Sequence, residues 1–425
     1  MAHRPSRRRR AALRIAATPT LPSLAPVRPP HPPQTAPRRA ERRQKPRRRA
    51  SPSRAGKGAG RLGPPDYILL TAVAGLLLLG LAMVYSASQL AVAGDPGYWM
   101  RRQALWAAIG LVALTVTAQV DYHVWQRLLW RRFSLVTMVL TVILLALVLK
   151  LGHTVYGAQR WLHFGLFSFQ PSELAKLVLA LYIADWLARK GDDVRSVLYG
   201  LIPFALVTGL VLALVLMQND MGSALIIACL AVTMFFVAGA SLLQLAPTAL
   251  IGGGLFALVV ARTGFRRARL DAFLHPLPPG CADAASYQIC QGLIALGSGG
   301  IFGRGLGASV AKAGYLPNPF TDSIFAVLGE ELGLLGCVVV LALFAALAYR
   351  GLRAGRRAPD RFGALLACGI TCWLVVQALV NIGAVTSEIA FTGVPLPFVS
   401  YGGSSLCVSL AAVGILLNIA RAART

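Results

Sequence analysis

YILLTAVAGLLLLGLAMVYSAS, residues 67–88, is an uninterrupted apolar run. A helix needs about 20 apolar residues to cross the hydrocarbon core of a bilayer, so this stretch is long enough to span a membrane. Nine further apolar stretches follow. The ten predicted spans are residues 67–88, 103–120, 133–150, 172–189, 196–216, 222–239, 244–261, 323–349, 363–385 and 402–420. The pattern predicts an all-α, polytopic integral membrane protein of about ten transmembrane helices, with a large extracytoplasmic loop between helices seven and eight.

The composition excludes a water-soluble enzyme. Of the 425 residues, 56% are hydrophobic and only 14% are charged, and the mean hydropathy is +0.63. Soluble globular domains carry about 25% charged residues.

The net charge of +26 is concentrated at the beginning of the chain. Residues 1–62 contain 18 Lys and Arg against one acid, Glu41. We predict that residues 1–63 form a disordered, basic, Pro- and Arg-rich cytoplasmic tail, because they have too little apolar surface to fold. The tail either binds anionic lipid headgroups or only fixes the topology. Residues 64–425 form the membrane domain, so we expect a membrane and no nucleic acid as partner.

The charged loops predict the orientation. With a cytoplasmic tail and ten spans, both termini lie in the cytoplasm, and the loops at 121–132, 189–195 and 350–362 are internal and basic, as the positive-inside rule requires. The external loop at 262–322 is also basic, but long loops escape this rule. Its cations are Arg262, Arg266, Arg267, Arg269, Arg304 and Lys312.

The seven cysteines are scattered along the chain. Their spacing predicts neither a metal site nor a disulfide framework. The sequence leaves the cofactor unknown, and a divalent cation stays open.

Ionisable residues in apolar spans are costly and therefore are functional candidates. Glu173 and Lys176 lie three residues apart at the start of the fourth predicted span, on one helix face, and either pair structurally or serve the site. Arg160 lies in the loop before them. Asp220 is placed either as the N-cap of the sixth span or as a functional acid.

Asp322 lies at the outer mouth of the eighth span, with Glu330 about two turns deeper. Thr321 could cap that helix as well as Asp322 could, which would leave the carboxylate available for chemistry. The glycine-rich stretch 297–307 could approach a phosphate, although it lacks the lysine of a P-loop. Residues 393–405, which include Ser404 and Ser405, break the chain before the last span, whose N-terminus suits an anion.

Four motifs together carry a family resemblance. They are GAQRWLHFGLFSFQPSELAK (157–176), YQICQGLIALGSGGIFGRGLG (287–307), TDSIFAVLGEELGLLG (321–336) and PLPFVSYGGSS (395–405). In this order and spacing they resemble the SEDS (shape, elongation, division and sporulation) proteins over residues 66–420. The stretch 266–276 followed by Tyr287-Gln288 is more similar to the division branch than to the elongation branch.

The chain departs from the family pattern at several positions. Phe320, Ser323 and Asn318 stand where the family usually has His, Phe and Glu. Residues 218–223 and 384–391, the latter with Glu388, also differ. The essential acid, Asp322, is kept.

The resemblance implies a peptidoglycan glycosyltransferase that polymerises lipid II on the outer face of the bacterial cytoplasmic membrane. The implied partners are a class B penicillin-binding transpeptidase and divisome membrane proteins. Asp322 is the expected base, and Lys312, Arg160 or the loop arginines would hold the diphosphate. Glu173, Lys176, Asp220, Ser404 and Ser405 are the other expected substrate-site residues. A lipid II flippase, a scaffold and the elongation polymerase are the alternatives.

Overall fold

The structure is a computed structural model that describes residues 63–423 except 93–94, 128–132, 156–157, 165–166, 262–272, 275–280 and 282–283. The predicted tail therefore lies outside the described residues, apart from Gly63. So do Arg262, Arg266, Arg267 and Arg269.

All ten predicted spans are helices. They are α1 (Tyr67–Ser88), α2 (Tyr98–Gln119), α4 (Phe133–Leu151), α5 (Pro171–Lys190), α6 (Ile202–Met217), α7 (Met221–Val237), α8 (Leu242–Ala261), α11 (Ile324–Arg357), α12 (Arg361–Val385) and α13 (Gly403–Ala422). Shorter helical elements are α3 (Val124–Arg127), η1 (Gly191–Arg195), the π-helical turn η2 (Val197–Leu201) and α10 (Ala284–Gly299). Helix α10 was not predicted from the sequence.

Within the described part of the chain, five helices are long and apolar enough to cross a membrane by length and composition alone. They are Tyr67–Ser88, Val197–Met217, Ile324–Arg357, Arg361–Val385 and Gly403–Ala422. A helix satisfies its own backbone hydrogen bonds, which the hydrocarbon core demands of a spanning segment. The chain is a multi-pass membrane protein, as predicted.

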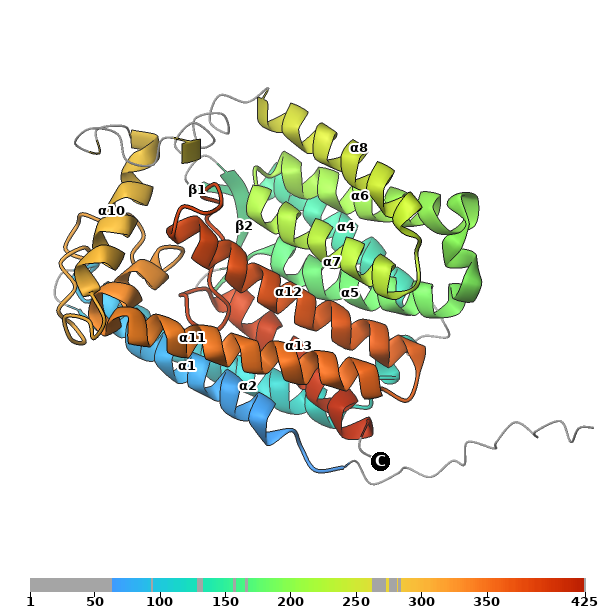
Figure 1. Ribbon diagram of the computed structural model, residues 1–425, viewed down its shortest axis with the longest axis horizontal. Helices are drawn as coiled ribbons and strands as arrows, with labels where there is room; N and C mark the ends of the chain where they lie inside the picture. Colours follow the sequence, from blue (N-terminus) through green and yellow to red (C-terminus); the bar gives the residue numbers. More distant parts are fainter. Residues whose placement is uncertain are drawn as a thin grey trace, which may run out of the picture. The chain divides into compact units, whose positions relative to one another are not determined.

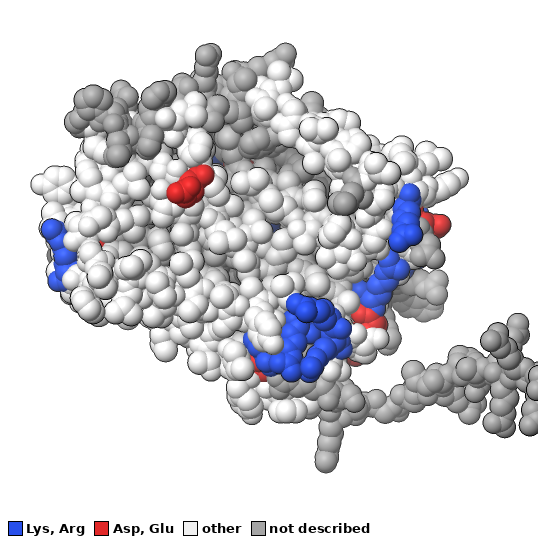
Figure 2. Space-filling view, in the orientation of Figure 1, with Lys and Arg blue, Asp and Glu red and all other residues white. Residues whose placement is uncertain are grey.

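The helices lie side by side, and their connections gather at two ends (Figure 1). We call the end with residues 153–169, 284–323 and 386–402 the loop end, and the end with residues 189–196 and 353–361 the basic end. Exposed arginines gather at the basic end, whereas the lateral surface in this view is almost uncharged (Figure 2). They include Arg189, Arg195, Arg356, Arg357 and Arg361.

Helix α13 lies at the centre of the bundle and packs against α2, α5, α11 and α12. Sixteen of its twenty residues are buried. Small residues allow a close approach to α2: a Cβ at Gly414 would lie 1.9 Å from the Thr117 hydroxyl, and one at Gly110 would lie 2.5 Å from Leu410. Small residues at the contact are how membrane helices pack closely.

At the basic end a polar cluster ties the α2–α3 turn to the start of α12. Both the Tyr122 hydroxyl and the His123 ring contact Asp360, whose carboxylate also accepts the Gly363 amide. Burial acts to raise the pKa of Asp360, but the hydrogen bonds from His123, Tyr122 and Gly363 outweigh it and lower that pKa to about 2. The Asp360 carboxylate therefore stays ionised at neutral pH.

A small antiparallel sheet, order β1-β2-β3, fills the α4–α5 connection. Its strands are β1 (His153–Val155), β2 (Ala158–Phe164) and β3 (Phe167–Phe169), and Leu162 pairs with Phe169. These strands were not predicted, because three to seven residues give too little alternation to distinguish a strand from a loop. The sheet carries Arg160 and Ser168 toward the start of α5.

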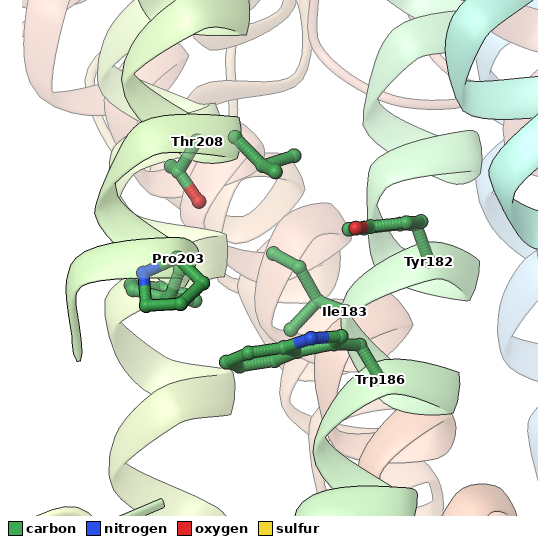
Figure 3. A pocket seen from close by; sticks show the side chains of 7 residues that line it. Tyr182, Ile183, Trp186, Pro203 and Thr208 are labelled. Carbon is green, nitrogen blue, oxygen red and sulfur yellow. The ribbon is translucent and has the colours of Figure 1, made fainter. Parts of the chain in front are cut away.

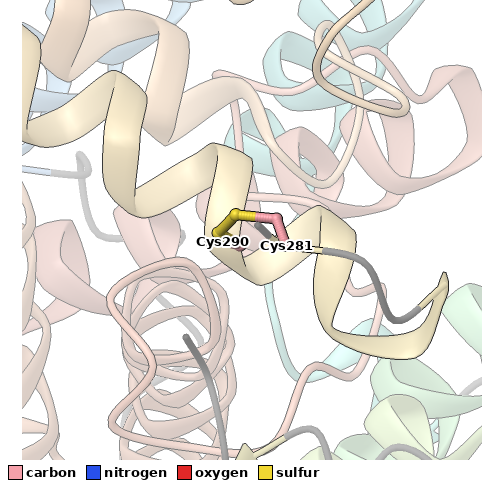
Figure 4. Close-up of a disulfide and its surroundings, with 2 residues drawn as sticks. All are labelled: Cys281 and Cys290. Carbon is pink, nitrogen blue, oxygen red and sulfur yellow. A yellow bond between two sulfur atoms is a disulfide. The ribbon is translucent and has the colours of Figure 1, made fainter. Parts of the chain in front are cut away.

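The spacing of the cysteines indicated no disulfide framework, but the structure contains a disulfide. Cys281 and Cys290 form a disulfide that links the segment before α10 to α10 itself (Figure 4). The seven scattered cysteines give no pattern from which the single Cys281–Cys290 pair could be predicted, because the two residues meet only in the folded loop. The other five, Cys229, Cys337, Cys368, Cys372 and Cys407, are free thiols.

This assignment predicts a count of reactive thiols. Alkylation of the denatured, unreduced protein is expected to modify five cysteines, and alkylation after reduction seven. Intact-mass spectrometry of the two samples measures the difference. Seven modified cysteines without reduction would show that the bond is absent.

Candidate functional site

Asp322 lies in the loop end, two residues before α11. The alternative role as the cap of α11 is not found, because the N-cap residue is Ser323. The Thr321 hydroxyl donates to Asp322 Oδ1 at 3.0 Å. The carboxylate is half-buried, so it is held in one position but stays within reach of a ligand.

Residues 392–394 run between Asp322 and the start of α7. A Cβ at Gly393, whose φ is +69°, would lie 3.4 Å from Asp322 Oδ2. On the other side, a Cβ at Gly222 would lie 2.0 Å from the Val394 side chain. The two glycines therefore let this segment bring the Asp322 loop and α7 together.

Asp220 is the N-cap of α7, which is one of the two roles that the sequence left open. Its Oδ1 accepts the Ser223 amide at 3.1 Å. Its Oδ2 accepts hydrogen bonds from the side-chain amide of Gln170 and from the Ser172 hydroxyl, both at 3.0 Å. These contacts join the starts of α5 and α7.

Ser404 adds the start of α13 to the same cluster. Its hydroxyl accepts the backbone N–H of Gln170 at 3.2 Å and donates to the Ser168 carbonyl at 3.1 Å. Ser405, the next residue, is buried. Three helix N-termini thus meet at the loop end, and their dipoles favour an anionic ligand.

Arg160 reaches this cluster from β2. Its guanidinium donates to the Asn219 carbonyl, and Nη1 lies 3.9 Å from Asp220 Oδ1. Its Nε is buried and has no hydrogen-bond partner. The side chain retains 18% exposure. Arg160 therefore brings a partly exposed positive charge to the cluster.

Glu173 and Lys176 form the buried ion pair that their spacing predicted. Nζ of Lys176 lies 2.8 Å from Glu173 Oε1, and both side chains are at most 1% exposed. The ammonium also donates to Gln377 Oε1 at 2.6 Å and lies 5.3 Å from the Trp373 ring centroid. Complete burial makes the pair structural, and it fastens α5 to α12.

Two amides of α12, Gln377 and Asn381, were not predicted. Gln377 Nε2 donates to the Pro395 carbonyl at 3.0 Å. Asn381 Nδ2 donates to the carbonyls of Val394, at 2.7 Å, and Asp322, at 2.8 Å. Their spacing of four puts both amides on one helix face. The sequence contains a signal for them, because both are polar residues inside an apolar span. An uncharged amide is a weaker indication of a functional site than an ionisable residue.

Lys312 is buried in contacts of its own. Its ammonium donates to Glu331 at 3.0 Å, the Ser86 hydroxyl at 3.0 Å and the Gly307 carbonyl at 2.7 Å. An ammonium has three N–H donors, and all three are used here. The partner Glu331, also not predicted, accepts from Ser86 on α1 as well.

The glycine-rich stretch 297–307 wraps around α11 instead of offering its amides to a phosphate. The amides of Arg304 and Gly305 donate to the carbonyls of Glu330 and Glu331, at 2.9 and 3.0 Å. A Cβ at Gly303 would lie 2.2 Å from the Glu331 carbonyl oxygen. Gly299 and Gly303 therefore serve close packing against α11, and the amides of Arg304 and Gly305 are already used, so the phosphate-binding hypothesis for this stretch is not supported.

A separate small pocket, about 40 Å³, lies between α5 and α6 (Figure 3). Tyr182 and Trp186 border it from α5, and Thr208 borders it from α6. Its lining residues carry no charge, so it offers no counter-charge to a diphosphate. Among the described residues, no group of three or more His, Cys, Asp or Glu side chains is placed to hold a metal ion.

The described loop end thus brings together Asp220, Arg160 and Ser404, and the segment 392–394 connects them to Asp322. The protein is therefore a multi-pass membrane protein whose polar candidate site lies at the starts of α5, α7 and α13. The family model described as "Cell cycle protein", which groups FtsW, RodA and SpoVE, matches residues 67–425. The chain belongs to this family.

Relatives cover most of the chain. A protein of Trichlorobacter lovleyi named "Probable peptidoglycan glycosyltransferase FtsW" is 40% identical over 84% of this chain and 94% of its own length. Stage V sporulation protein E of Bacillus subtilis is 39% identical over 85% of this chain and 98% of its own length.

Solved structures agree with the fold. The Thermus thermophilus rod shape determining protein RodA has a TM-score of 0.61 and 29% identity, covering 84% of this chain and 97% of that one. A chain from a peptidoglycan synthase complex, described as coordinating polymerization and crosslinking, has a TM-score of 0.67 and 27% identity over 84% and 98%.

Proposed function

We propose that this protein is a peptidoglycan glycosyltransferase that polymerises lipid II into glycan strands. The observation that carries the proposal is Asp322, a half-buried carboxylate two residues before α11, which the segment 392–394 connects to the start of α7. The names of the FtsW relatives support the same activity.

The reaction needs a base and a site for the leaving group. The 4-hydroxyl of one lipid-linked disaccharide attacks the anomeric carbon of another, a glycosidic bond forms, and undecaprenyl diphosphate leaves. Asp322 accepts the hydroxyl proton. Arg160 and the N-termini of α5, α7 and α13 stabilise the charge that develops on the diphosphate.

The orientation and partners are part of the proposal. The basic end faces the cytoplasm by the positive-inside rule, which places both termini inside and the loop end, with Asp322, outside the cytoplasmic membrane. We propose a class B penicillin-binding transpeptidase as the partner and septal synthesis, with divisome membrane proteins, as the setting. The synthase complex among the structural neighbours supports such a pairing.

Reconstitution tests this function. Purified protein is incubated with lipid II, with and without its transpeptidase, and the products are separated by size. Glycan strands are the expected result. A protein that only moves lipid II across vesicles and forms no strands would instead be the flippase.

Lys312 is proposed as a positioning residue rather than a direct diphosphate ligand, because its three donors are already used. Lys312→Met is expected to lower turnover about tenfold or more by displacing the loop before Asp322. In the double variant Lys312→Met/Glu331→Gln, the unpaired Glu331 carboxylate is removed as well, so part of the lost turnover should be recovered. Lys150→Met, at an exposed lysine of α4, is the control. If the double variant is as inactive as the single one, Lys312 acts as a direct ligand of the diphosphate and not as a positioning residue.

A further inference from the structure

Three aromatic side chains from separate segments of the chain pack against one another at the loop end. Trp99, on the first turn of α2, stacks on Phe320 with centroids 5.2 Å apart and an interplanar angle of 29°. Tyr401, just before α13, meets Trp99 edge-on at 5.0 Å and Phe320 at 5.9 Å. We call these three side chains the aromatic platform.

The platform is fixed to the loop that carries Asp322. Phe320 precedes Asp322 by two residues, and its carbonyl accepts the Tyr401 amide at 2.9 Å. Gln103 of α2 holds the other side: its Nε2 donates to the Ser400 carbonyl at 3.1 Å, and its Oε1 accepts the Gly402 amide at 3.3 Å. The rings are therefore held in a defined position relative to the loop that carries Asp322.

The platform is not a closed core. All three side chains are only half-buried, and the Trp99 indole N–H is shielded from solvent without a hydrogen-bond acceptor. Buried indole N–H groups usually have a partner. Half-exposed aromatic surface beside a polar loop is a lining that small-molecule sites show.

Aromatic residues also gather at membrane interfaces as belts. Tyr85, near the end of α1 and 45% exposed, fits that description. The platform differs, because its rings come from three separate elements, pack on one another and are tied by backbone hydrogen bonds to the loop of the proposed base.

We infer that the aromatic platform is a carbohydrate subsite that stacks on the pyranose presenting its hydroxyl to Asp322, that is, the N-acetylhexosamine of the attacking lipid-linked disaccharide. This inference rests on the proposed function. A pyranose has a face of C–H groups with slight positive charge, which packs on the negative face of an aromatic ring. The proximity of Phe320 to Asp322 in the chain selects the attacking sugar rather than the lipid.

The test measures binding without turnover. In the Asp322→Asn background, fluorescently labelled lipid II is bound in detergent and displaced by the soluble N-acetylglucosaminyl-N-acetylmuramic acid disaccharide. Phe320→Leu, which keeps apolar volume but removes the ring, is expected to weaken both affinities about tenfold, which corresponds to about 1.4 kcal/mol. Phe320→Tyr, which keeps a ring, and Tyr85→Leu, the interfacial control, should stay within about twofold.

Each outcome is decisive. Unchanged affinities in Phe320→Leu, or an equal loss in Tyr85→Leu, would overturn the subsite while leaving the polymerase proposal intact. If Phe320→Leu weakens lipid II binding but leaves displacement by the disaccharide unchanged, the platform binds the lipid, and the carbohydrate subsite is overturned. Failure of the Asp322→Asn parent to bind lipid II would overturn the proposed function together with the subsite.

Discussion

Asp322→Asn is expected to abolish glycan strand formation while expression and membrane insertion stay normal. Asparagine has the same shape and keeps an oxygen that can accept the Thr321 hydroxyl, so the loop should retain its position. It cannot take up the proton of the attacking hydroxyl. General base catalysis contributes about 100-fold to 10,000-fold, and a loss in that range is predicted.

Strand formation from lipid II, quantified by gel after equalising the amount of folded protein, measures the effect. Glu388→Gln serves as the matched control, because Glu388 is an exposed carboxylate in the same loop end. Near-normal polymerisation by Asp322→Asn would rule out the base assignment. An equal loss in Glu388→Gln would show that the assay reports surface charge instead.

Lys176→Met is expected to destabilise the bundle by about 3–5 kcal/mol, because it leaves the Glu173 carboxylate buried without a counter-charge. Glu173 Oε2 already has no hydrogen-bond partner, so the carboxylate has little other compensation. Thermal unfolding in detergent should show a clearly lower midpoint.

Two further variants separate the pair from its surroundings. Glu173→Gln/Lys176→Met should recover much of the lost stability, because no ion is then stranded. Lys190→Met, at the basic end of the same helix, should change the unfolding free energy by about 1 kcal/mol or less. If Lys176→Met unfolds at the parental temperature with parental activity, the pairing does not stabilise the protein.

The spans could be predicted because hydropathy is a local property: each run of apolar residues indicates its own helix. The Glu173–Lys176 pair and the Asp220 cap were predictable for the same reason, since their partners lie within four residues. The contacts of Asn381 with Asp322 and of Lys312 with Ser86 join segments 59 and 226 residues apart, and no periodicity reports such a pairing.

The loop end was harder to predict than the bundle. Short strands, a helix with mixed polarity and a single disulfide leave weak patterns when the sequence is taken alone. Gly303 illustrates the difficulty. Glycine is needed wherever the backbone closely approaches a phosphate, and it is needed equally where the backbone closely approaches α11. Only the position of Glu331 distinguishes the two.

The central position of α13 constrains how the protein is made. This helix follows the other nine spans along the chain, so it leaves the ribosome after them, yet its neighbours α2, α5, α11 and α12 all pack against it. Until α13 is made, the surfaces of these four helices that it covers lack their partner, and the backbone N–H of Gln170 lacks the Ser404 hydroxyl that accepts its hydrogen bond. The N-terminus of α13 is therefore the last part of the proposed site to be synthesised, and a nascent chain stalled before α13 would lack the contacts of Ser404 with Gln170 and Ser168.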